Sequence, residues 1–445
     1  MFRSLLVANR GEIARRIIRT ARSLGLRTIA VYSDADQDSV HVREADEAIR
    51  IGPPPAKESY LNFEAIIEAA KRTGAEAIHP GYGFLSENAQ FAAAVRASGL
   101  VFIGPPPDVI RSMGDKVEAR KRMLAAGVPV VPGTLDRVRS VEEALSVAEE
   151  IGYPLLIKAS AGGGGIGMER VDSPAMLQER FEALSARAER FFGDGGLFLE
   201  KWIEGARHIE VQIAADRFGN VVHLFERDCS VQRRHQKIIE EAPAPNLDPS
   251  VRALLLNAAI LGARAIGYEN VGTMEFILDP LNHFYFIEMN TRLQVEHPVT
   301  EMVAGVDLVE WQLRIAAGEI LPQTQEAISA YGAAIEARIY AEDPANFHPS
   351  PGKVKLVRWP GGARIETWIE AGTKITPFYD PLLAKIIVHG VTRSQAIEQL
   401  ATALAETNIE GVKTNLPLLQ TIVTDPLFVS GRYDTGLVQR LKRPI

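Results

Sequence analysis

Over the first hundred residues, the pattern of hydrophobic and polar positions switches between apolar runs typical of buried strands and the spacing typical of helices. Largely apolar runs at 2–8, 28–32 and 101–103 have the length of buried strands. Between them, residues 12–23 carry apolar side chains at helical spacing. Strands that alternate with helices predict an open parallel sheet, with ligands near the carboxyl ends of its strands. We therefore expect an α/β unit over residues 1–113, although its first turn lacks the GxGxxG pattern of nicotinamide-binding folds.

A second unit is expected over residues 114–203. A helix is predicted at 112–126, and apolar runs predict strands at 153–159, 168–171 and 197–203. The remaining residues, 204–445, mix strands and helices, with a polar turn expected at 227–230 between strands. The chain is thus predicted to be α/β with α+β lobes.

A glycine-rich stretch, GGGGIG at 162–167, separates the first two strands of the second unit. Without Cβ atoms, such a backbone brings several N–H groups close to phosphate oxygens. Lys116 and Lys158 are placed to neutralise phosphate charge nearby. No GK[ST] follows, so the stretch is not a Walker loop. Taken alone, it fits a flexible surface hairpin equally well, and each lysine fits a solvated charge.

The strongest chemical signal is a predicted hairpin with strands at 273–278 and 284–290. Glu275 then lies opposite Glu288, and Asn290 points the same way because side chains alternate along a strand. Hard oxygen ligands in this arrangement suit Mg²⁺ or Mn²⁺ carried on nucleotide phosphates. An isolated acidic pair of this kind is also typical of the wet face of an ordinary hairpin. The polar alternation continues through residues 292–297, which favours a site.

Three weaker signals accompany the hairpin. Residues 200–203 end a strand with an acid and a base side by side, which is typical of an adenine-binding edge but also of any strand end. The basic stretch at 233–237 adds local positive charge, although a solvated loop explains it equally well. His208 and His235 are weak signals singly, since a lone histidine is usually structural.

Composition narrows the class of protein. The 445 residues are 46% hydrophobic and 24% charged, and about three lobes are expected at that length. A net charge of −7 argues against nucleic acid as a partner. Cys229 is the single cysteine, which excludes an internal disulfide and fits a reducing, cytoplasmic location. No apolar run approaches the roughly 20 residues that span a bilayer, so no membrane association is expected.

The motifs together resemble the biotin carboxylase family of ATP-grasp ligases over nearly the whole chain. The matching segments, in order, are ANRGEIA at 8–14, HPGYGFLSEN at 79–88, ERDCS at 226–230, QRRHQK at 232–237, EMNTR at 288–292, QVEHP at 294–298 and AEDP at 341–344. The resemblance implies an N-terminal pre-ATP-grasp sheet (1–113), an ATP-grasp lid (114–203) and a C-terminal lobe (204–445) with the metal, bicarbonate and biotin sites.

The resemblance also implies a reaction and its site residues. ATP would activate bicarbonate to carboxyphosphate, and the carboxyl group would pass to N1 of biotin. Positions that match ATP contacts are Lys116, Lys158, Gly163, Gly164, Gly165, Ile166, Gly167, Met168, Glu200, Lys201, Ile203, His208, Gln232, His235, Glu275 and Glu288. Glu275, Glu288 and Asn290 match ligands of two Mg²⁺ or Mn²⁺ ions. Lys237, Arg292, Gln294, Val295 and Glu296 match the bicarbonate pocket, and Tyr82, Arg292 and Arg338 match the biotin site.

Within this set, four positions match catalytic groups. Glu296 matches the base that deprotonates bicarbonate, and Arg338 matches the residue that steadies the biotin enolate. Lys237 and Arg292 match cationic groups that hold the anions.

The chain departs from many family members in the glycine-rich stretch. Ile166 and Glu169 stand where basic residues are common. The GIG form and Pro377–Pro381 are similar to urea carboxylases, whereas residues 112–116 are closer to acyl-CoA and 2-oxo-acid carboxylases. The final carboxyl acceptor is therefore left open.

Partners follow from what the chain lacks. No lysine lies between methionines as a biotinyl lysine does. Biotin is thus expected as a substrate on a carboxyl carrier protein or domain, with a carboxyltransferase component, and a homodimer is expected from the resemblance. Two alternatives remain: a different ATP-grasp ligase, which leaves QVEHP and Arg338 without a task, and a nucleotide-binding scaffold without turnover.

Overall fold

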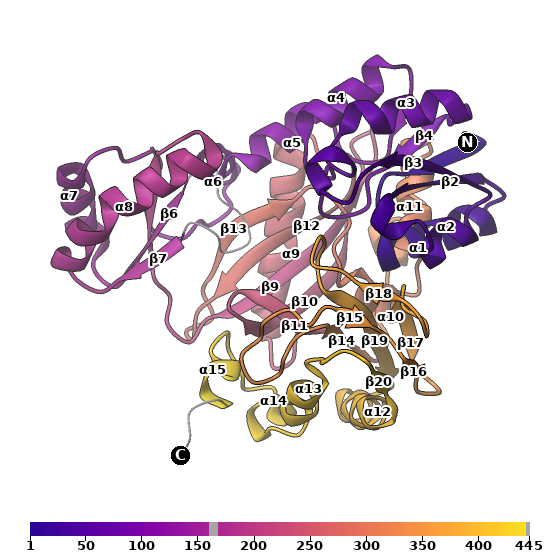
Figure 1. Cartoon of the computed structure of the whole chain (residues 1–445). Coiled ribbons are helices and arrows are strands. Elements are labelled where there is room, and N and C mark those ends of the chain that lie inside the picture. The colour runs from indigo at the N-terminus through magenta and orange to yellow at the C-terminus, as the bar shows by residue number, and fades with distance from the viewer. Residues whose placement is uncertain (160–167, 442–445) are drawn as a thin grey trace.

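Three main sheets organise the chain in the computed structural model, which describes residues 1–159 and 168–441 (Figure 1). A five-stranded sheet forms the N-terminal part, a three-stranded sheet the second part, and an eight-stranded sheet most of the remainder. None of the helices in these described ranges is long and apolar enough to cross a membrane.

The N-terminal sheet is parallel, in the order β3-β2-β1-β4-β5. Its strands are β1 (Ser4–Val7), β2 (Arg27–Ser33), β3 (Glu47–Gly52), β4 (Ala77–His79) and β5 (Val101–Phe102). Its helices are α1 (Gly11–Ser23), α2 (Val40–Glu44), α3 (Phe63–Thr73), α4 (Ala89–Ala97) and α5 (Pro107–Gly114). Leu5 and Leu6 on β1 enter two different cores, one on each face of the sheet. Both faces are covered, which explains why β1 is apolar without alternation.

The helix predicted over 112–126 is two helices, α5 and α6 (Lys116–Ala125), so that prediction is wrong in its continuity. Asp115 between them has an extended backbone, with ψ of 110°. Its carboxylate accepts hydrogen bonds from the N–H groups of Val117 and Glu118. Asp115 is therefore the N-cap of α6, and Lys116 stands at the first position of that helix.

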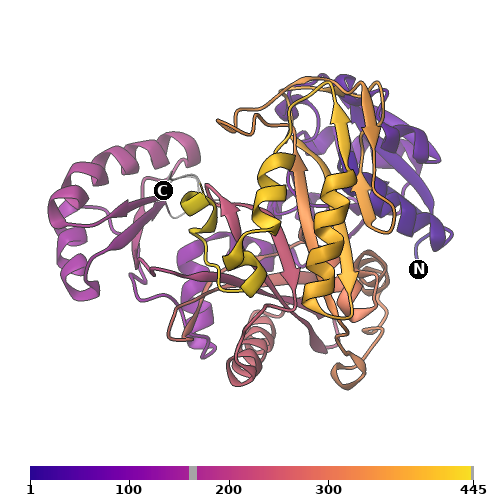
Figure 2. The same cartoon turned by 90° about the horizontal axis from the view of Figure 1, so that it is seen from below.

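The three-stranded unit has its own core and stands to one side of the molecule in both views (Figures 1 and 2). Its elements are α7 (Val141–Ile151), β6 (Leu155–Ala159), β7 (Met168–Val171), α8 (Pro174–Phe192) and β8 (Leu197–Lys201). Leu155 and Ile157 of β6 share this core with Leu177 and Phe181 of α8. The unit boundaries at residues 113 and 203 remain predictions.

The eight-stranded sheet is antiparallel throughout, in the order β13-β12-β9-β10-β11-β14-β19-β17. Its strands are β9 (Arg207–Ala215), β10 (Val221–Arg233), β11 (Gln236–Ala242), β12 (Asn270–Leu278), β13 (Phe284–Asn290), β14 (Ala333–Tyr340), β17 (Arg364–Thr367) and β19 (Leu382–Gly390). Short strands form two small sheets: β15 (Gly352–Lys353) with β18 (Lys374–Ile375), and β16 (Leu356–Arg358) with β20 (Asn408–Glu410).

Two helices, α9 and α12, pack on apolar side chains of this sheet. α9 (Pro249–Ala265) packs on β9 and β10, and α12 (Arg393–Glu406) packs on β14 and β19, as Figure 2 shows for the latter. The other helices are α10 (His297–Ala304), α11 (Leu308–Ala316), α13 (Leu416–Val423), α14 (Pro426–Ser430) and α15 (Leu437–Leu441).

The polar turn expected at 227–230 is wrong, because these residues continue β10. Arg227 is fully buried there. Its guanidinium donates to Glu210, Gln212, Thr273 and Thr300. Buried polar groups are tolerated inside a strand when neighbouring elements satisfy their hydrogen bonds.

Candidate active site

The hairpin of β12 and β13 has the predicted register, with Glu275 directly opposite Glu288. The Asn290 amide nitrogen donates to Glu275 Oε1 at 2.8 Å, which places all three side chains together as expected. Lys116 Nζ donates to Glu288 Oε2 at 2.6 Å. This lysine lowers the pKa of Glu288 more than burial raises it. A cation on α6 therefore meets an acid on the large sheet.

Lys237 on β11 joins three carboxylates. Its Nζ donates to Glu275 Oε1 at 2.9 Å and to Glu296 Oε1 at 2.6 Å, and it also donates to Glu210. Burial opposes the charge on this lysine, but the three carboxylates raise the pKa of Lys237 well above its usual value. The ammonium thus stays protonated and links the acidic hairpin to the segment that carries Glu296.

Glu296 lies in the loop after β13, at the position just before α10. The alternation at 292–297 is therefore no strand; it is a loop that turns into a helix. Arg338 on β14 donates to Glu296 Oε2 at 2.9 Å and is also ion-paired with Glu240. Burial opposes ionisation of Glu296, yet Lys237 and Arg338 lower its pKa far below the usual range. Glu296 is a carboxylate at neutral pH.

Arg292 and Gln294 extend the cluster toward the N-terminal unit. The Arg292 Nε donates to Glu87 Oε2 at 2.9 Å, and its Nη2 donates to Asn290 Oδ1 at 2.8 Å. The Gln294 amide donates to Glu275 Oε1 at 2.9 Å. The loop is thus pinned from both sides, by Glu87 of the N-terminal unit and by the hairpin.

His208 and Gln232 lie together on β9 and β10. The Gln232 amide nitrogen is 2.8 Å from His208 Nδ1, and His208 Nε2 is 2.8 Å from Glu275 Oε2. Burial lowers the pKa of His208, but the carboxylates of Glu275 and Glu210 together raise it more, and the net shift is upward. His235 lies at the turn between β10 and β11, where its φ is 66°. Burial and the nearby charge of Lys158 lower the pKa of His235.

The remaining predicted ATP contacts lie on the three-stranded unit. Glu200 is buried between Lys158 and Arg120, each of which donates to it. Burial raises the pKa of Glu200, and these two cations lower it below its usual value. Lys201 Nζ donates to the carbonyls of residues 152 and 153 at 2.9 Å each, and Ile203 follows the end of β8.

The glycine-rich stretch lies outside the described residues. This applies to Gly163, Gly164, Gly165, Ile166 and Gly167. Met168 begins β7 opposite Lys158.

Next to it, Glu169 is ion-paired with Arg180 and Arg187 of α8. The negative charge of Glu169, which stands where basic residues are common in the family, is therefore neutralised within the three-stranded unit.

Several residues of the cluster were missed by sequence reasoning. Glu210 had a readable signal, because His208, Glu210 and Gln212 alternate along β9 and share one face. Glu87 and Arg120 had none, since their partners are distant in sequence.

The donor set fits a divalent cation held with phosphates. Glu275 and Glu288 present carboxylate oxygens across one register pair, and donor atoms of His208, Glu210 and Glu275 lie within 4.8 Å of one another. Hard oxygen donors of this kind suit Mg²⁺ or Mn²⁺. Asn290 lies close enough to complete the ligand set.

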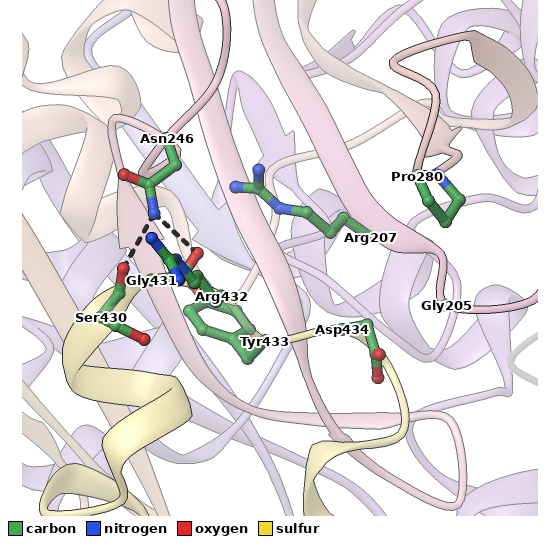
Figure 3. A pocket seen from close by; sticks show the side chains of 9 residues that line it. All are labelled: Gly205, Arg207, Asn246, Pro280, Ser430, Gly431, Arg432, Tyr433 and Asp434. Atoms are coloured by element: carbon green, nitrogen blue, oxygen red, sulfur yellow. Dashed lines mark hydrogen bonds between the residues drawn. The ribbon is translucent and has the colours of Figure 1, made fainter.

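A cavity of about 590 Å³ lies elsewhere, between the β12–β13 turn and the segment 430–434 (Figure 3). Arg207 lines it, while the next residue on β9, His208, belongs to the acidic cluster. Successive side chains of a strand point to opposite faces. The cavity therefore lies across the sheet from the cluster and is a separate feature.

An antiparallel sheet with an acidic hairpin, accompanied by a lysine on α6 and another on the three-stranded unit, defines an ATP-grasp ligase. Residues 1–110 match the family described as "Biotin carboxylase, N-terminal domain", and residues 336–440 match "Biotin carboxylase C-terminal domain". Residues 115–324 match "Carbamoyl-phosphate synthase L chain, ATP binding domain". The chain belongs to the biotin carboxylase family.

Individual relatives agree with this assignment. The biotin carboxylase of Halalkalibacterium halodurans is 55% identical over 98% of this chain and 97% of its own length. The biotin carboxylase of Campylobacter jejuni, solved with an ATP analogue, has a TM-score of 0.97 at 45% identity and covers 99% of both chains. The biotin carboxylase domain dimer of Hydrogenobacter thermophilus 2-oxoglutarate carboxylase was solved with MgADP, ADP and bicarbonate. It has a TM-score of 0.96 at 48% identity over 99% of this chain and 98% of that one.

Proposed function

We propose that the protein uses ATP and bicarbonate to carboxylate N1 of biotin, the first half-reaction of a biotin-dependent carboxylase. The observation that carries this proposal is Lys237, whose ammonium is bonded at once to Glu275 and Glu296. Lys237 thus holds Glu275, which is suited to a metal–phosphate complex, next to Glu296, which is suited to bicarbonate. A purely nucleotide-binding scaffold would have no use for the second carboxylate.

The first step forms carboxyphosphate. Glu296 takes the proton of bicarbonate, a bicarbonate oxygen bonds to the γ-phosphorus, and the bond from that phosphorus to ADP breaks. Lys116 and Lys158 hold the phosphate charge. The other residues around the nucleotide are Glu200, Lys201, Ile203, His208, Gln232 and His235. Glu275, Glu288 and Asn290 would hold Mg²⁺ or Mn²⁺, which would neutralise charge on the phosphates.

The second step transfers the carboxyl group. Carboxyphosphate breaks into CO₂ and phosphate, the phosphate takes the N1 proton of biotin, and N1 bonds to CO₂. Arg338 stabilises the negative charge that develops on the ureido oxygen, because a fixed guanidinium favours a developing anion. Lys237, Arg292, Gln294 and Val295 hold bicarbonate, and Tyr82 and Arg292 border the biotin site.

Biotin reaches this site on a separate carrier protein or domain, and a carboxyltransferase component consumes the product. A homodimer, a cytoplasmic location and the absence of nucleic-acid and membrane partners complete the proposal. The acceptor remains open between acyl-CoA, 2-oxo acid and urea.

The test is the fixation of labelled bicarbonate into free biotin. We expect acid-labile label on biotin that requires ATP and Mg²⁺ together. Label that forms with another nucleophile in place of biotin would favour a different ATP-grasp ligase.

A further inference from the structure

A buried lysine outside the predicted site contacts both of its substrate pockets. Lys385 on β19 has no exposed side-chain surface. Its Nζ donates to the carbonyl oxygen of Val295 at 2.7 Å and lies 3.1 Å from Glu12 Oε1. The Tyr82 hydroxyl donates to that same oxygen of Glu12. One ammonium therefore connects the bicarbonate loop to the tyrosine of the biotin site.

The position of Lys385 in the sheet strengthens this connection. Lys385 is the register partner of Arg338 across β14 and β19. Cross-strand partners project from the same face, so the two cations are neighbours. Glu12 offsets part of their repulsion. It lies in the first turn of α1, where the helix dipole favours a carboxylate.

The loop that carries Glu296 has no ladder hydrogen bonds of its own. Residues 291–296 form neither strand nor helix, and side chains supplement the backbone hydrogen bonds that the Gln294 and Glu296 carbonyls accept from the start of α10. Glu87 accepts from the Thr291 N–H at 3.1 Å, and Lys385 donates to the Val295 carbonyl, one residue before Glu296. Lys385 thus fixes the backbone at the residue next to the base.

We propose that Lys385, neutralised by Glu12, is a positioning residue that sets the Val295–Glu296 backbone and the Tyr82 hydroxyl relative to each other. Its side-chain polar contacts within the described part of the chain are with Val295 and Glu12, neither of which is among the residues assigned to ATP or to the metal. Its loss displaces the bicarbonate and biotin pockets while leaving the nucleotide pocket in place. The inference rests on the proposed function, since it concerns how that site aligns its two smaller substrates.

The experiment compares Lys385→Met with Lys413→Met. Lys413 is a matched control, because its side chain is 67% exposed and pairs with Asp343 at the surface. For Lys385→Met we expect the KM values for bicarbonate and biotin to rise about tenfold or more, because small displacements of reacting groups are costly. The KM for ATP stays within about twofold. The ratio of ADP released to biotin carboxylated also rises above that of the wild type. Lys413→Met leaves all of these values unchanged.

A second variant decides the case if Lys385→Met does not fold. Glu12→Gln keeps an acceptor for the Tyr82 hydroxyl and removes the charge that holds Lys385. It is expected to raise the same two KM values by a smaller factor. Unchanged KM values and coupling in the folded variant, with only a lower Tm, would overturn the inference and leave a purely structural ion pair. Failure of the wild type to carboxylate biotin would instead overturn the proposed function.

Discussion

At the scale of single residues, the site is a balance of buried charges. Glu210, Glu275 and Glu296 share the ammonium of Lys237, and Glu296 also accepts from Arg338. Removing one member of such a network leaves a partner charge uncompensated, which costs more than the pair contributes. Conservative substitutions are therefore the informative ones.

Glu296→Gln keeps the size of the side chain and removes the carboxylate proposed as the base. We expect kcat for biotin carboxylation to fall by about 10² to 10⁴, the usual contribution of a general base. The Kd for ATP should stay within about twofold, because Lys116, Lys158 and Glu288 are untouched. Carboxylation assays measure kcat, and ATP titration of the same preparation measures the Kd. Full activity in Glu296→Gln would remove this residue from the mechanism.

The contacts that residue spacing predicted were local ones, whereas Lys237, Glu296 and Arg338 were named through the family resemblance without their contacts. Glu275 and Glu288 belong to one hairpin, so their register followed from the turn. The contact of Lys237 with Glu296 joins β11 to a loop 59 residues away, and no local pattern encodes it. Lys385 and Glu12 were missed for the same reason.

At the scale of elements, caps and packed ion pairs decide where the charged side chains stand. Asp115 separates α5 from α6 and starts α6 at Lys116. Helical periodicity continued through this point, so the sequence predicted one helix. The extended ψ of Asp115, stabilised by its capping bonds, overrode that periodicity.

Asp115→Ala removes the cap of α6 and the ion pair with Arg137. Loss of an N-cap costs about 1 kcal/mol of stability. The KM for ATP should rise severalfold, because Lys116 is the first residue of the released turn. Asp115→Asn keeps the capping acceptor and serves as the control, with a smaller change in Tm and in KM. An unchanged KM in Asp115→Ala would show that the cap does not position Lys116.

Glu366 on β17 forms a pH-dependent ion pair between the eight-stranded sheet and α1. Its carboxylate, 2% exposed, accepts from Arg364 Nε at 2.8 Å and from Arg19 Nη2 at 2.6 Å. Burial raises the pKa of Glu366, but these arginines outweigh it and lower the pKa from 4.5 to about 2. Because the pKa is lower in the folded state, the ionised Glu366 stabilises the protein at pH values above its unfolded-state pKa. This stabilisation is lost as the pH falls from 4.5 toward 2.

Glu366→Gln should therefore lower the free energy of unfolding at pH 7 by on the order of 3 kcal/mol. The deficit should shrink when unfolding is measured below about pH 4. Glu370→Gln is the matched control, because Glu370 is half-exposed and its pair with Arg43 lies at the surface. An equal deficit at both pH values would contradict the assigned ionisation.

The strand β10 shows where patterns at this scale fail. Residues 227–230 are polar and were expected to turn, yet they are buried within the strand. Their pairing with β11 shifts between Asp228 and Val231, so the strand absorbs an irregularity there. Polarity alone cannot distinguish a solvated turn from a strand whose partners arrive from β9, β12 and α10.

At the scale of the whole molecule, three regions converge on one site. The eight-stranded sheet supplies the acids, the segment from α6 to β8 supplies Lys116, Lys158 and Glu200, and the N-terminal unit supplies Tyr82 and Glu87. The alternation of periods predicted the parallel N-terminal sheet. The order of the eight strands, which places β14 between β11 and β19, depends on long-range packing that no single segment specifies.

The most direct test of this account is ADP release by the purified protein with Mg²⁺, ATP and bicarbonate, with and without free biotin. We expect ADP release that requires bicarbonate and is stimulated by biotin. Release that is independent of bicarbonate, or that biotin and a biotinylated carrier both fail to stimulate, would contradict it.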